Sequence, residues 1–402
     1  MAVSVVDISL PKLGRCLRVQ NAPDAVQALA QALSGWPLTV HSAQGATPDT
    51  YIYRDSDGMW QGSRHEENEF ELPTAASAAC SLVGELVARR LETEPTLLGL
   101  HCGSVEINGK LVLFPESSKA GKSTLTVAFA AAGYRVFGDD VLGLTAQGEG
   151  VAMGVAPRLR MPMPDSFSAE FVEYAERYAG PEDERYRFVI PAENRLARYD
   201  DISPVGAIVL LERNPQTLEP EVVKLAAGEG LLQLLSQNFA DSDTPDEELI
   251  ERLLPLIQRV PCLMLRYSEP LAGARYLAKA IENPHLQRAN SASLLNYMPA
   301  SVDDAASYDL DRIWLPAEGV SSYSLGDELF LIAPLTGDIH RLNASGKIAW
   351  QLLQHEPVSG HALSDVIAAY FSVPLNAVTA DLSVLLRALS QADLIVSPAS
   401  QS

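Results

Sequence analysis

The stretch Phe114-Pro-Glu-Ser-Ser-Lys-Ala-Gly-Lys-Ser-Thr-Leu125 decides the fold of this chain. Its Gly-Lys-Ser follows an apolar run and opens an alanine-rich run, so it predicts a strand, a turn and a helix. The backbone N–H groups of such a turn point at phosphate oxygens, and the helix dipole adds to the attraction. Lys122 can neutralise the β- and γ-phosphates of a nucleotide, and the hydroxyl of Ser123 can hold Mg²⁺. We therefore expect a phosphate-binding loop, the P-loop, over residues 116–124.

The sequence on both sides of the P-loop supports this prediction. Before it, β-like runs at 103–107 and 110–114 are separated by Asn108-Gly109, which strongly indicates a hairpin. After it, a predicted helix over 122–132 is followed by a short strand that leads into Gly138-Asp139-Asp140. The hairpin makes the loop strand antiparallel to the strand before it, whereas most P-loop proteins reach this strand by a crossover in a parallel sheet.

This arrangement resembles the group formed by HPr kinase/phosphorylase and phosphoenolpyruvate carboxykinase. In HPr kinases, too, a His precedes the hairpin and two Asp follow the helix, and the matching residues here are His101, Asp139 and Asp140. The resemblance is specific over residues 100–145 and becomes diffuse towards residue 282. It implies an α/β (α+β) P-loop core and an ATP-dependent kinase.

The resemblance also implies a role for each residue of the site. Asp139 would accept the proton of an attacking hydroxyl, Asp140 would hold metal, and His101 would stabilise negative charge. Both Asp side chains can reach one site only if the strand has ended, because neighbours in a strand point to opposite faces. The expected catalytic residues are Asp139, His101 and Lys122; the nucleotide-binding residues are Ser118, Lys119, Ala120, Gly121, Lys122, Ser123, Thr124, Arg158 and Arg160; the Mg²⁺ ligands are Ser123 and Asp140.

Two positions depart from the usual GxxxxGKS pattern of the loop. Glu116 replaces the first glycine, and Lys119 stands where a middle glycine is expected. A carboxylate near a polyphosphate costs electrostatic energy unless it points outward or is offset by a cation such as Lys119. The departures leave open an inactive pseudokinase that presents peptides. A kinase of a free small molecule is the third possibility.

A second resemblance lies near the C-terminus, in residues 337–353, GDIHRLNASGKIAWQLL. It is similar to the PqqD family of peptide-binding domains, in which a short strand runs into Leu-Asn and a helix carrying Trp follows. Asn343 suits a helix N-cap, and Trp350 suits a core anchor. Strands predicted at 321–324, 328–332 and 338–342, followed by helices at 345–353, 364–371 and 378–391, indicate a winged-helix-like unit. The resemblance implies that a leader peptide adds as a strand near 337–342 and packs against 378–391.

These patterns predict four segments: a small α/β segment at 1–95, the P-loop core at 96–282, a linker at 283–309 and the PqqD-like domain at 310–402. The first segment shows no chemistry, so we expect a scaffold or a surface for a homo-oligomer. Together the segments indicate a kinase for a Ser or Thr hydroxyl of a peptide or small protein. Its partner would be a leader peptide or an HPr-like carrier, with a role in ribosomal peptide modification.

Composition limits the other partners. The chain has 402 residues and a net charge of −21, from 51 acidic and 30 basic side chains, and such a surface repels nucleic acid. No apolar run is long enough for a membrane span, and no secretory signal is visible, so we expect a cytoplasmic protein. The four cysteines have neither metal-binding nor disulfide spacing and are expected to be buried: Cys16, Cys80, Cys102 and Cys262.

Overall fold

The computed structural model describes residues 4–64, 68–115, 121–192, 194–239, 245–289 and 310–398. The chain divides into two units, one of residues 1–242 with 255–290 and the other of residues 243–254 with 291–402. The N-terminal segment and the P-loop core therefore belong to one unit. The first residues of the expected linker also belong to it, since Gln287–Arg288 forms a strand that pairs with Glu221–Lys224.

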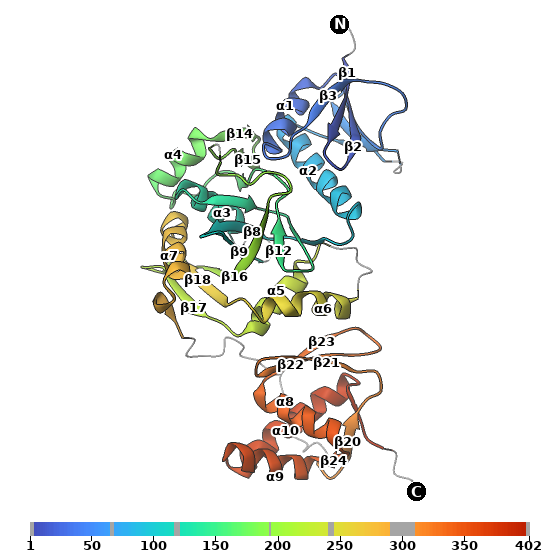
Figure 1. The fold of residues 1–402 in the computed structure, drawn as a ribbon, viewed down its shortest axis with the longest axis vertical. Coiled ribbons are helices and arrows are strands. Elements are labelled where there is room, and N and C mark those ends of the chain that lie inside the picture. The colour runs from blue at the N-terminus through green and yellow to red at the C-terminus, as the bar shows by residue number, and fades with distance from the viewer. Residues whose placement is uncertain are drawn as a thin grey trace. The chain divides into compact units, whose positions relative to one another are not determined.

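The first unit is built around a ten-stranded sheet that carries the P-loop strand (Figure 1). As expected, β8 (Gly103–Ile107) and β9 (Lys110–Phe114) pair antiparallel. Asn108 and Gly109 join them with φ angles of 51° and 72°. Two consecutive left-handed residues form the tight hairpin turn that Asn-Gly favours, which explains why the sequence signal was reliable.

Three parallel strands fix the edge of the sheet at which the P-loop begins. β9 pairs in parallel with β16 (Ile202–Arg213), and β16 pairs in parallel with β18 (Cys262–Tyr267). Their carboxyl ends therefore meet at one edge, where open α/β sheets commonly bind ligands. The other strands of this sheet are β7 (Leu98–Leu100), β10 (Arg135–Gly138), β11 (Leu142–Leu144), β12 (Glu149–Val151), β17 (Glu221–Lys224) and β19 (Gln287–Arg288).

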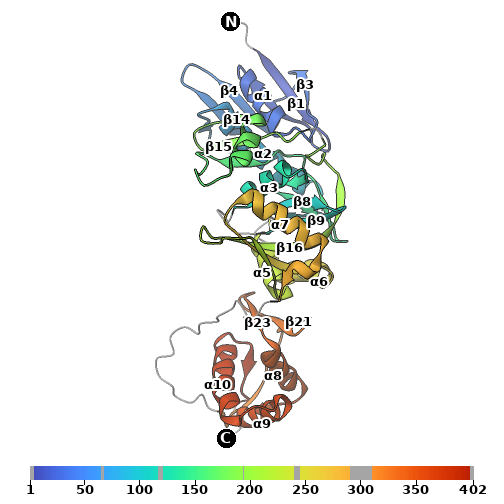
Figure 2. The same ribbon diagram turned by 90° about the vertical axis from the view of Figure 1, so that its left-hand side faces the viewer.

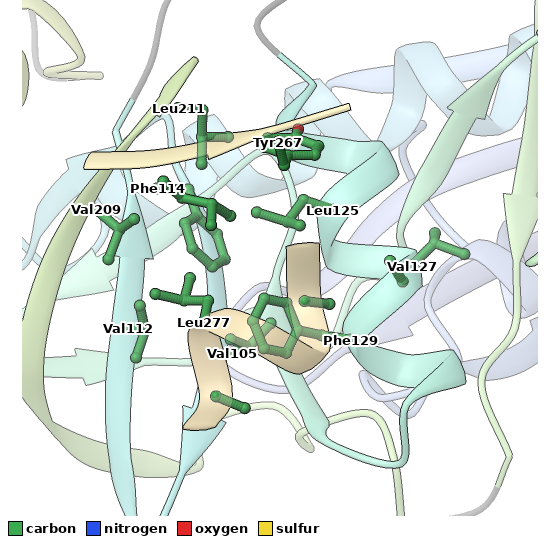
Figure 3. Packing of buried hydrophobic residues seen from close by; sticks show 14 of the residues in the cluster. Val105, Val112, Phe114, Leu125, Val127, Phe129, Val209, Leu211, Tyr267 and Leu277 are labelled. Atoms are coloured by element: carbon green, nitrogen blue, oxygen red, sulfur yellow. The ribbon is translucent and has the colours of Figure 1, made fainter. Parts of the chain in front are cut away.

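Helices cover both faces of β16, which is why its apolar run is continuous rather than alternating. Val209 and Leu211 join the core cluster that includes Leu125 of α3 (Lys122–Ala131) and Leu277 of α7 (Pro270–Glu282), as Figure 3 shows. The preceding residue, Ile208, faces α5 (Ala227–Ser236), where a Cβ on Gly230 would lie 3.6 Å from Ile208 Cγ2. Figure 2 shows α7 alongside the sheet. The other helices described between residues 96 and 289 are α4 (Ala169–Arg177), α6 (Asp246–Ile257) and the 3-10 helix η1 (Pro284–Leu286).

The N-terminal segment forms a six-stranded sheet with two helices, α1 (Pro23–Ala32) and α2 (Ala75–Glu92). It is bound to the core by backbone hydrogen bonds, among them Gly35 N to Gly154 O at 2.9 Å and Ala156 N to Ala32 O at 2.8 Å. Trp36 also stacks on Tyr199, with ring centroids 4.5 Å apart. The strands of this sheet are β1 (Val5–Leu10), β2 (Gly14–Gln20), β3 (Thr39–Ser42), β4 (Thr50–Arg54), β5 (Met59–Ser63) and β6 (Phe70–Glu71).

A separate three-stranded sheet in the P-loop core consists of β13 (Arg158–Arg160), β14 (Ala179–Glu182) and β15 (Tyr186–Val189).

The second unit contains the predicted three strands and three helices. β21 (Ser321–Leu325), β22 (Glu328–Ile332) and β23 (Ile339–Leu342) form an antiparallel sheet in that order. Trp350 is buried in a core with Val378, Leu382, Leu386 and Leu389 of the last helix, as its apolar spacing predicted. The helices are α8 (Ala344–His355), α9 (Gly360–Phe371) and α10 (Leu375–Gln391), and a second small sheet holds β20 (Ile313–Pro316), β24 (Val358–Ser359) and β25 (Ile395–Val396).

Two expectations from composition can be compared with the structure. Three of the four cysteines are buried, Cys80 is partly exposed, and all four are free. None of the helices in the described part of the chain combines the length and apolar character that a membrane crossing requires.

Candidate active site

The P-loop begins at the end of β9 and ends where α3 starts at Lys122. Gly121, the residue before the helix, has a φ of 103°, and a Cβ there would lie 2.7 Å from the hydroxyl of Tyr267. Glycine is therefore required for two reasons, the left-handed backbone and the close approach of a buried side chain. The expectations for Glu116, Ser118, Lys119 and Ala120 concern residues outside the described part of the chain.

Lys122 lies deep in the site. Its residue is only 6% exposed, and its positive charge is one of the causes that lower the pKa of Asp140. The first turn of α3 packs tightly on β8, since a Cβ on Gly103 would lie 2.9 Å from Thr126 Oγ1 and 3.7 Å from Lys122 Cβ. Ser123 and Thr124 follow in the same turn. The buried amino group is thus held by a rigid element rather than by a loop.

Asp139 is a buried carboxyl group directly after β10, which ends at Gly138 as the site required. The residue is 3% exposed, and its Oδ2 accepts a hydrogen bond of 2.9 Å from the backbone N–H of Arg158. Its Oδ1 is buried and has no hydrogen-bond partner among the described residues. Burial and the negative charge of Asp140 raise the pKa of Asp139 to about 7, although the Arg158 N–H and the nearby Ser123 hydroxyl act to lower it. A carboxyl group with a pKa near 7 suits a general base at neutral pH.

Asp140 has a different environment from its neighbour. Its side chain is 41% exposed, and its Oδ2 accepts a 2.8 Å hydrogen bond from Nη2 of Arg158. Nε2 of His101 lies 3.6 Å from its Oδ1. Partial removal from water opposes ionisation, but His101 and the positive charges of Arg158 and Lys122 outweigh it and lower the pKa of Asp140. The two neighbouring carboxyl groups are therefore pushed towards different protonation states, which commonly separates a base from a metal-binding or electrostatic role.

The structure separates the two arginines that the sequence analysis treated alike. Arg158 contacts both carboxyl groups, and its guanidinium stacks over Tyr186 at 4.5 Å from the ring centroid. Arg160, two residues further along β13, is exposed and does not line the cavity described below. Arg158 thus joins the expected site with His101, Lys122 and the Asp pair.

The oxygen donors of the site fit a Mg²⁺ ion that binds together with nucleotide phosphates. Mg²⁺ usually takes one or two carboxylates plus phosphate and water oxygens rather than a cage of protein ligands. The Ser123 hydroxyl and the Asp140 carboxylate are such donors, and both neighbour Asp139 with its unpartnered Oδ1. Among the described residues, no three His, Cys, Asp or Glu side chains form a metal-binding cluster on their own.

A cavity of about 240 Å³ lies beside the Asp pair. Its polar residues are His101, Asp139, Asp140 and Arg158. Its other side is largely apolar and includes residues of α2, from the N-terminal segment. The lining there comprises Cys80, Val83, Gly84, Val87, Phe137, Gly138, Val141, Val155, Ala156, Phe188 and Phe239.

The α2 residues, Phe239 and Tyr267 carry no sequence signal that places them in this region. The α2 residues read as one face of an amphipathic helix, which does not distinguish a core face from a cavity wall. Phe239 reaches the site because its N–H binds Gly99 O at 2.7 Å and its ring meets His101, pairings between distant parts of the sequence. No local pattern could have indicated these contacts.

Three comparisons with known proteins bear on the two units. A family model described as Coenzyme PQQ synthesis protein D (PqqD) matches residues 328–395. The solved structure of TbiB1 in complex with the TbiA(beta) leader peptide is 31% identical over 21% of this chain and 99% of that chain, with a TM-score of 0.20. The Hpr(Ser) kinase/phosphatase from Coxiella burnetii is 14% identical over 47% of this chain and 96% of that chain, with a TM-score of 0.24. No curated protein matches the chain.

The fold defines an α/β domain in which the β8–β9 hairpin precedes α3, followed by a winged-helix-like domain. Residues 328–395 match the PqqD family model, so the C-terminal unit contains a PqqD-like domain. The predicted PqqD-like domain is thus confirmed by the family match, and an Hpr(Ser) kinase/phosphatase is among the solved structures that the chain resembles.

Proposed function

We propose that this chain is an ATP-dependent kinase that phosphorylates a Ser or Thr hydroxyl of a peptide during the maturation of a ribosomally made peptide. The observation that carries the proposal is the buried Asp139 beside Ser123 of α3, whose first turn also holds the buried Lys122. A small carrier protein resembling HPr is the other protein substrate that this chemistry would accept.

In the proposed reaction the substrate hydroxyl attacks the γ-phosphorus of ATP while the bond from that phosphorus to the β–γ bridging oxygen breaks. The products are the phosphorylated peptide and ADP. Asp139 accepts the hydroxyl proton, and Lys122 neutralises charge on the β- and γ-phosphates. Mg²⁺, when bound, would add positive charge at these phosphates, with Ser123 and Asp140 as its protein ligands. Arg158 holds Asp140 in place and His101 lies beside it.

The PqqD domain would supply the peptide. TbiB1, which the chain resembles over 21% of its length, was solved in complex with a leader peptide. Here β23 pairs only with β22 among the described residues, so one edge of the sheet is open to an added strand. We propose that a leader peptide adds along β23 and contacts α10. Because the domain is tethered to the site, it would raise the local concentration of the peptide there.

Glu116 and Lys119 motivate one alternative, a scaffold that presents peptides without phosphoryl transfer. The two functions separate in an assay with labelled ATP, Mg²⁺ and a candidate precursor peptide chosen from the genes beside that of this protein. The kinase predicts incorporation of label by the parent and loss of at least 100-fold in Lys122→Ala and in Asp139→Asn, since each removes a group that acts on the reacting atoms. Equal incorporation by the parent and both variants would refute this mechanism. A parent that binds peptide but neither binds ATP nor transfers phosphate would be the scaffold.

A further inference from the structure

The cavity beside the Asp pair has no role in the chemistry derived so far. None of the described P-loop residues, 121–124, lines it, whereas Asp139 and Asp140 do. The Asp pair therefore borders this cavity and also lies near the start of α3, where the Ser123 hydroxyl helps to lower the pKa of Asp139. A substrate hydroxyl that enters beside Asp139 from the cavity would give its proton to that carboxylate while its oxygen faces the γ-phosphate.

The size and lining of the cavity indicate what it can hold. Its volume of about 240 Å³ is below the ~300–1,000 Å³ of pockets for drug-sized ligands, and it suits a group of the size of one or two amino-acid side chains. On the α2 side, Val83 and Val87 present only hydrocarbon, and Phe137 and Phe188 extend this apolar wall. Hydrocarbon surface favours an apolar group over a second charged group such as a phosphate or carboxylate.

Gly84 keeps the α2 side of the cavity open. It is exposed within α2, and a Cβ added there would meet nothing within 4 Å. Neither a close contact nor a left-handed backbone angle explains a glycine at this position, and Ala would be the better helix former. The missing side chain leaves room where a ligand would need it.

We propose that this cavity is the acceptor subsite, and that it receives an apolar side chain of the peptide next to the Ser or Thr whose hydroxyl reaches Asp139. This inference rests on the proposed kinase function and gives the substrate a local signature, an apolar residue flanking the phosphorylated one. It also gives the N-terminal segment a role in specificity, because α2 forms the wall.

The first test fills the cavity. The parent, Gly84→Ala and Gly84→Leu are compared for kcat and KM with ATP–Mg²⁺ and the candidate precursor peptide. Gly84→Leu is expected to raise the KM for peptide at least tenfold and to change the KM for ATP less than twofold, with Gly84→Ala in between. Ala88→Leu, one turn further along α2 and outside the cavity lining, is the matched control and should behave as the parent. Unchanged peptide KM in a folded Gly84→Leu, checked by thermal unfolding, would overturn the subsite.

The second test needs no turnover. Cys80 lines the cavity and is the only partly exposed cysteine, since Cys16, Cys102 and Cys262 are buried. The peptide without ATP is expected to slow iodoacetamide labelling of Cys80 at least fivefold, and a peptide whose apolar residue beside the phosphorylated position is replaced by Asp should not. Protection by both peptides alike, or by neither, would overturn the inference. If peptide protects Cys80 but the parent transfers no phosphoryl group, the kinase function is refuted and the cavity remains a peptide-binding pocket. If free serine is phosphorylated as fast as the peptide, the apolar side chain is not the occupant of the cavity and the inference is overturned.

Discussion

Arg158 binds Asp140 through its guanidinium, with Nη2 2.8 Å from Oδ2. The same residue binds Asp139 through its backbone N–H, so one side chain and one backbone group of a single residue hold the two carboxyl groups. The two contacts can be tested separately, because a substitution of Arg158 removes the guanidinium contact with Asp140 and keeps the backbone contact with Asp139.

Replacing Arg158 by Gln is expected to lower kcat by about 10- to 100-fold, the usual effect of losing a group that orients a ligand or reactive residue. The cause is the loss of the cation that fixes Asp140 and favours its ionised form. Steady-state kinetics with peptide and ATP–Mg²⁺ would measure the change. Arg275→Gln removes a similar ion pair, with Glu170, at an exposed surface and should alter kcat less than twofold. Equal kcat values for the two variants would show that the Arg158 side chain is not needed.

The start of α3 can be tested through Gly121 and Tyr267. Gly121→Ala would place a Cβ on a residue with a left-handed φ, and this Cβ would lie 2.7 Å from the Tyr267 hydroxyl. We therefore expect the variant to lose about 1–3 kcal/mol of unfolding free energy and to bind nucleotide at least tenfold more weakly. Tyr267→Phe removes a buried hydroxyl that has no partner among the described residues and should be close to neutral. Urea unfolding and nucleotide titration would give both quantities.

The double variant separates the two causes. In the Tyr267→Phe background, Gly121→Ala should cost less, because the contact with the hydroxyl has gone and only the backbone strain remains. Gly109→Ala is the matched control for strain alone, since its φ is 72° and an added Cβ there meets nothing within 4 Å. If Gly121→Ala costs the same in both backgrounds, the close approach of Tyr267 does not constrain the loop.

A pH-dependent contribution to stability is expected in the N-terminal sheet. Asp7 is buried and accepts hydrogen bonds from Arg18, at 2.8 Å to Nε and 3.1 Å to Nη2. The Arg18 hydrogen bond lowers the pKa of Asp7 in the folded chain, in spite of burial. A lowered carboxyl pKa stabilises the fold fully above the unfolded value, near 4, and this contribution is lost as the pH falls through the folded value.

Asp7→Asn should therefore lower the unfolding free energy at pH 7 by about 2–3 kcal/mol, and the difference from the parent should shrink as the pH falls below about 4. Urea unfolding over a pH series measures this. Asp24→Asn breaks an exposed pair with Arg54 and is expected to cost less than about 1 kcal/mol. A difference that stays constant down to the lowest pH at which the chain folds would contradict the linkage.

The open edge of β23 predicts the effect of a single proline. Because Ala333 N donates to Asp338 O, the register with β22 leaves the N–H groups of Ile339 and Arg341 pointing to the unpaired edge. Ile339→Pro removes one of these donors at the first residue of the strand, where proline is tolerated. Peptide affinity, measured by fluorescence anisotropy, should fall about five- to tenfold.

Ser322→Pro is the control for this variant, because the register between β21 and β22 places its N–H at the opposite edge of the same sheet. It should bind peptide as the parent does. The reverse result, with Ser322→Pro weakened and Ile339→Pro unaffected, would move the peptide to β21.

Much of the fold was predictable because its signals are local. The runs at 103–107 and 110–114 matched β8 and β9 to the residue, since Asn108-Gly109 dictates the hairpin by its own backbone preferences. The helices of the second unit also followed from their apolar spacing. By contrast, β20, β24 and β25 were missed, because short strands of two to four residues that pair across long sequence separations carry little pattern of their own.

The candidate site was predictable where chemistry requires particular residue types. His101, Lys122, Asp139 and Asp140 are brought together as expected, and Gly138 ends the strand as needed. The cavity wall was not predictable, because Val83 and Val87 look like core residues in the sequence. The first segment, expected to show no chemistry, lies against the site only through tertiary packing.

The central claim is that the start of α3 and the Asp pair transfer a phosphoryl group to a peptide. The most direct test is the intact mass of the candidate precursor peptide, after incubation with the full chain, ATP and Mg²⁺, with ADP formation followed in parallel. We predict a mass increase of one phosphoryl group on a Ser or Thr, with one ADP formed per modified peptide, and neither product with Lys122→Ala. An unmodified peptide, under conditions in which the chain demonstrably binds both peptide and ATP–Mg²⁺, would contradict the claim.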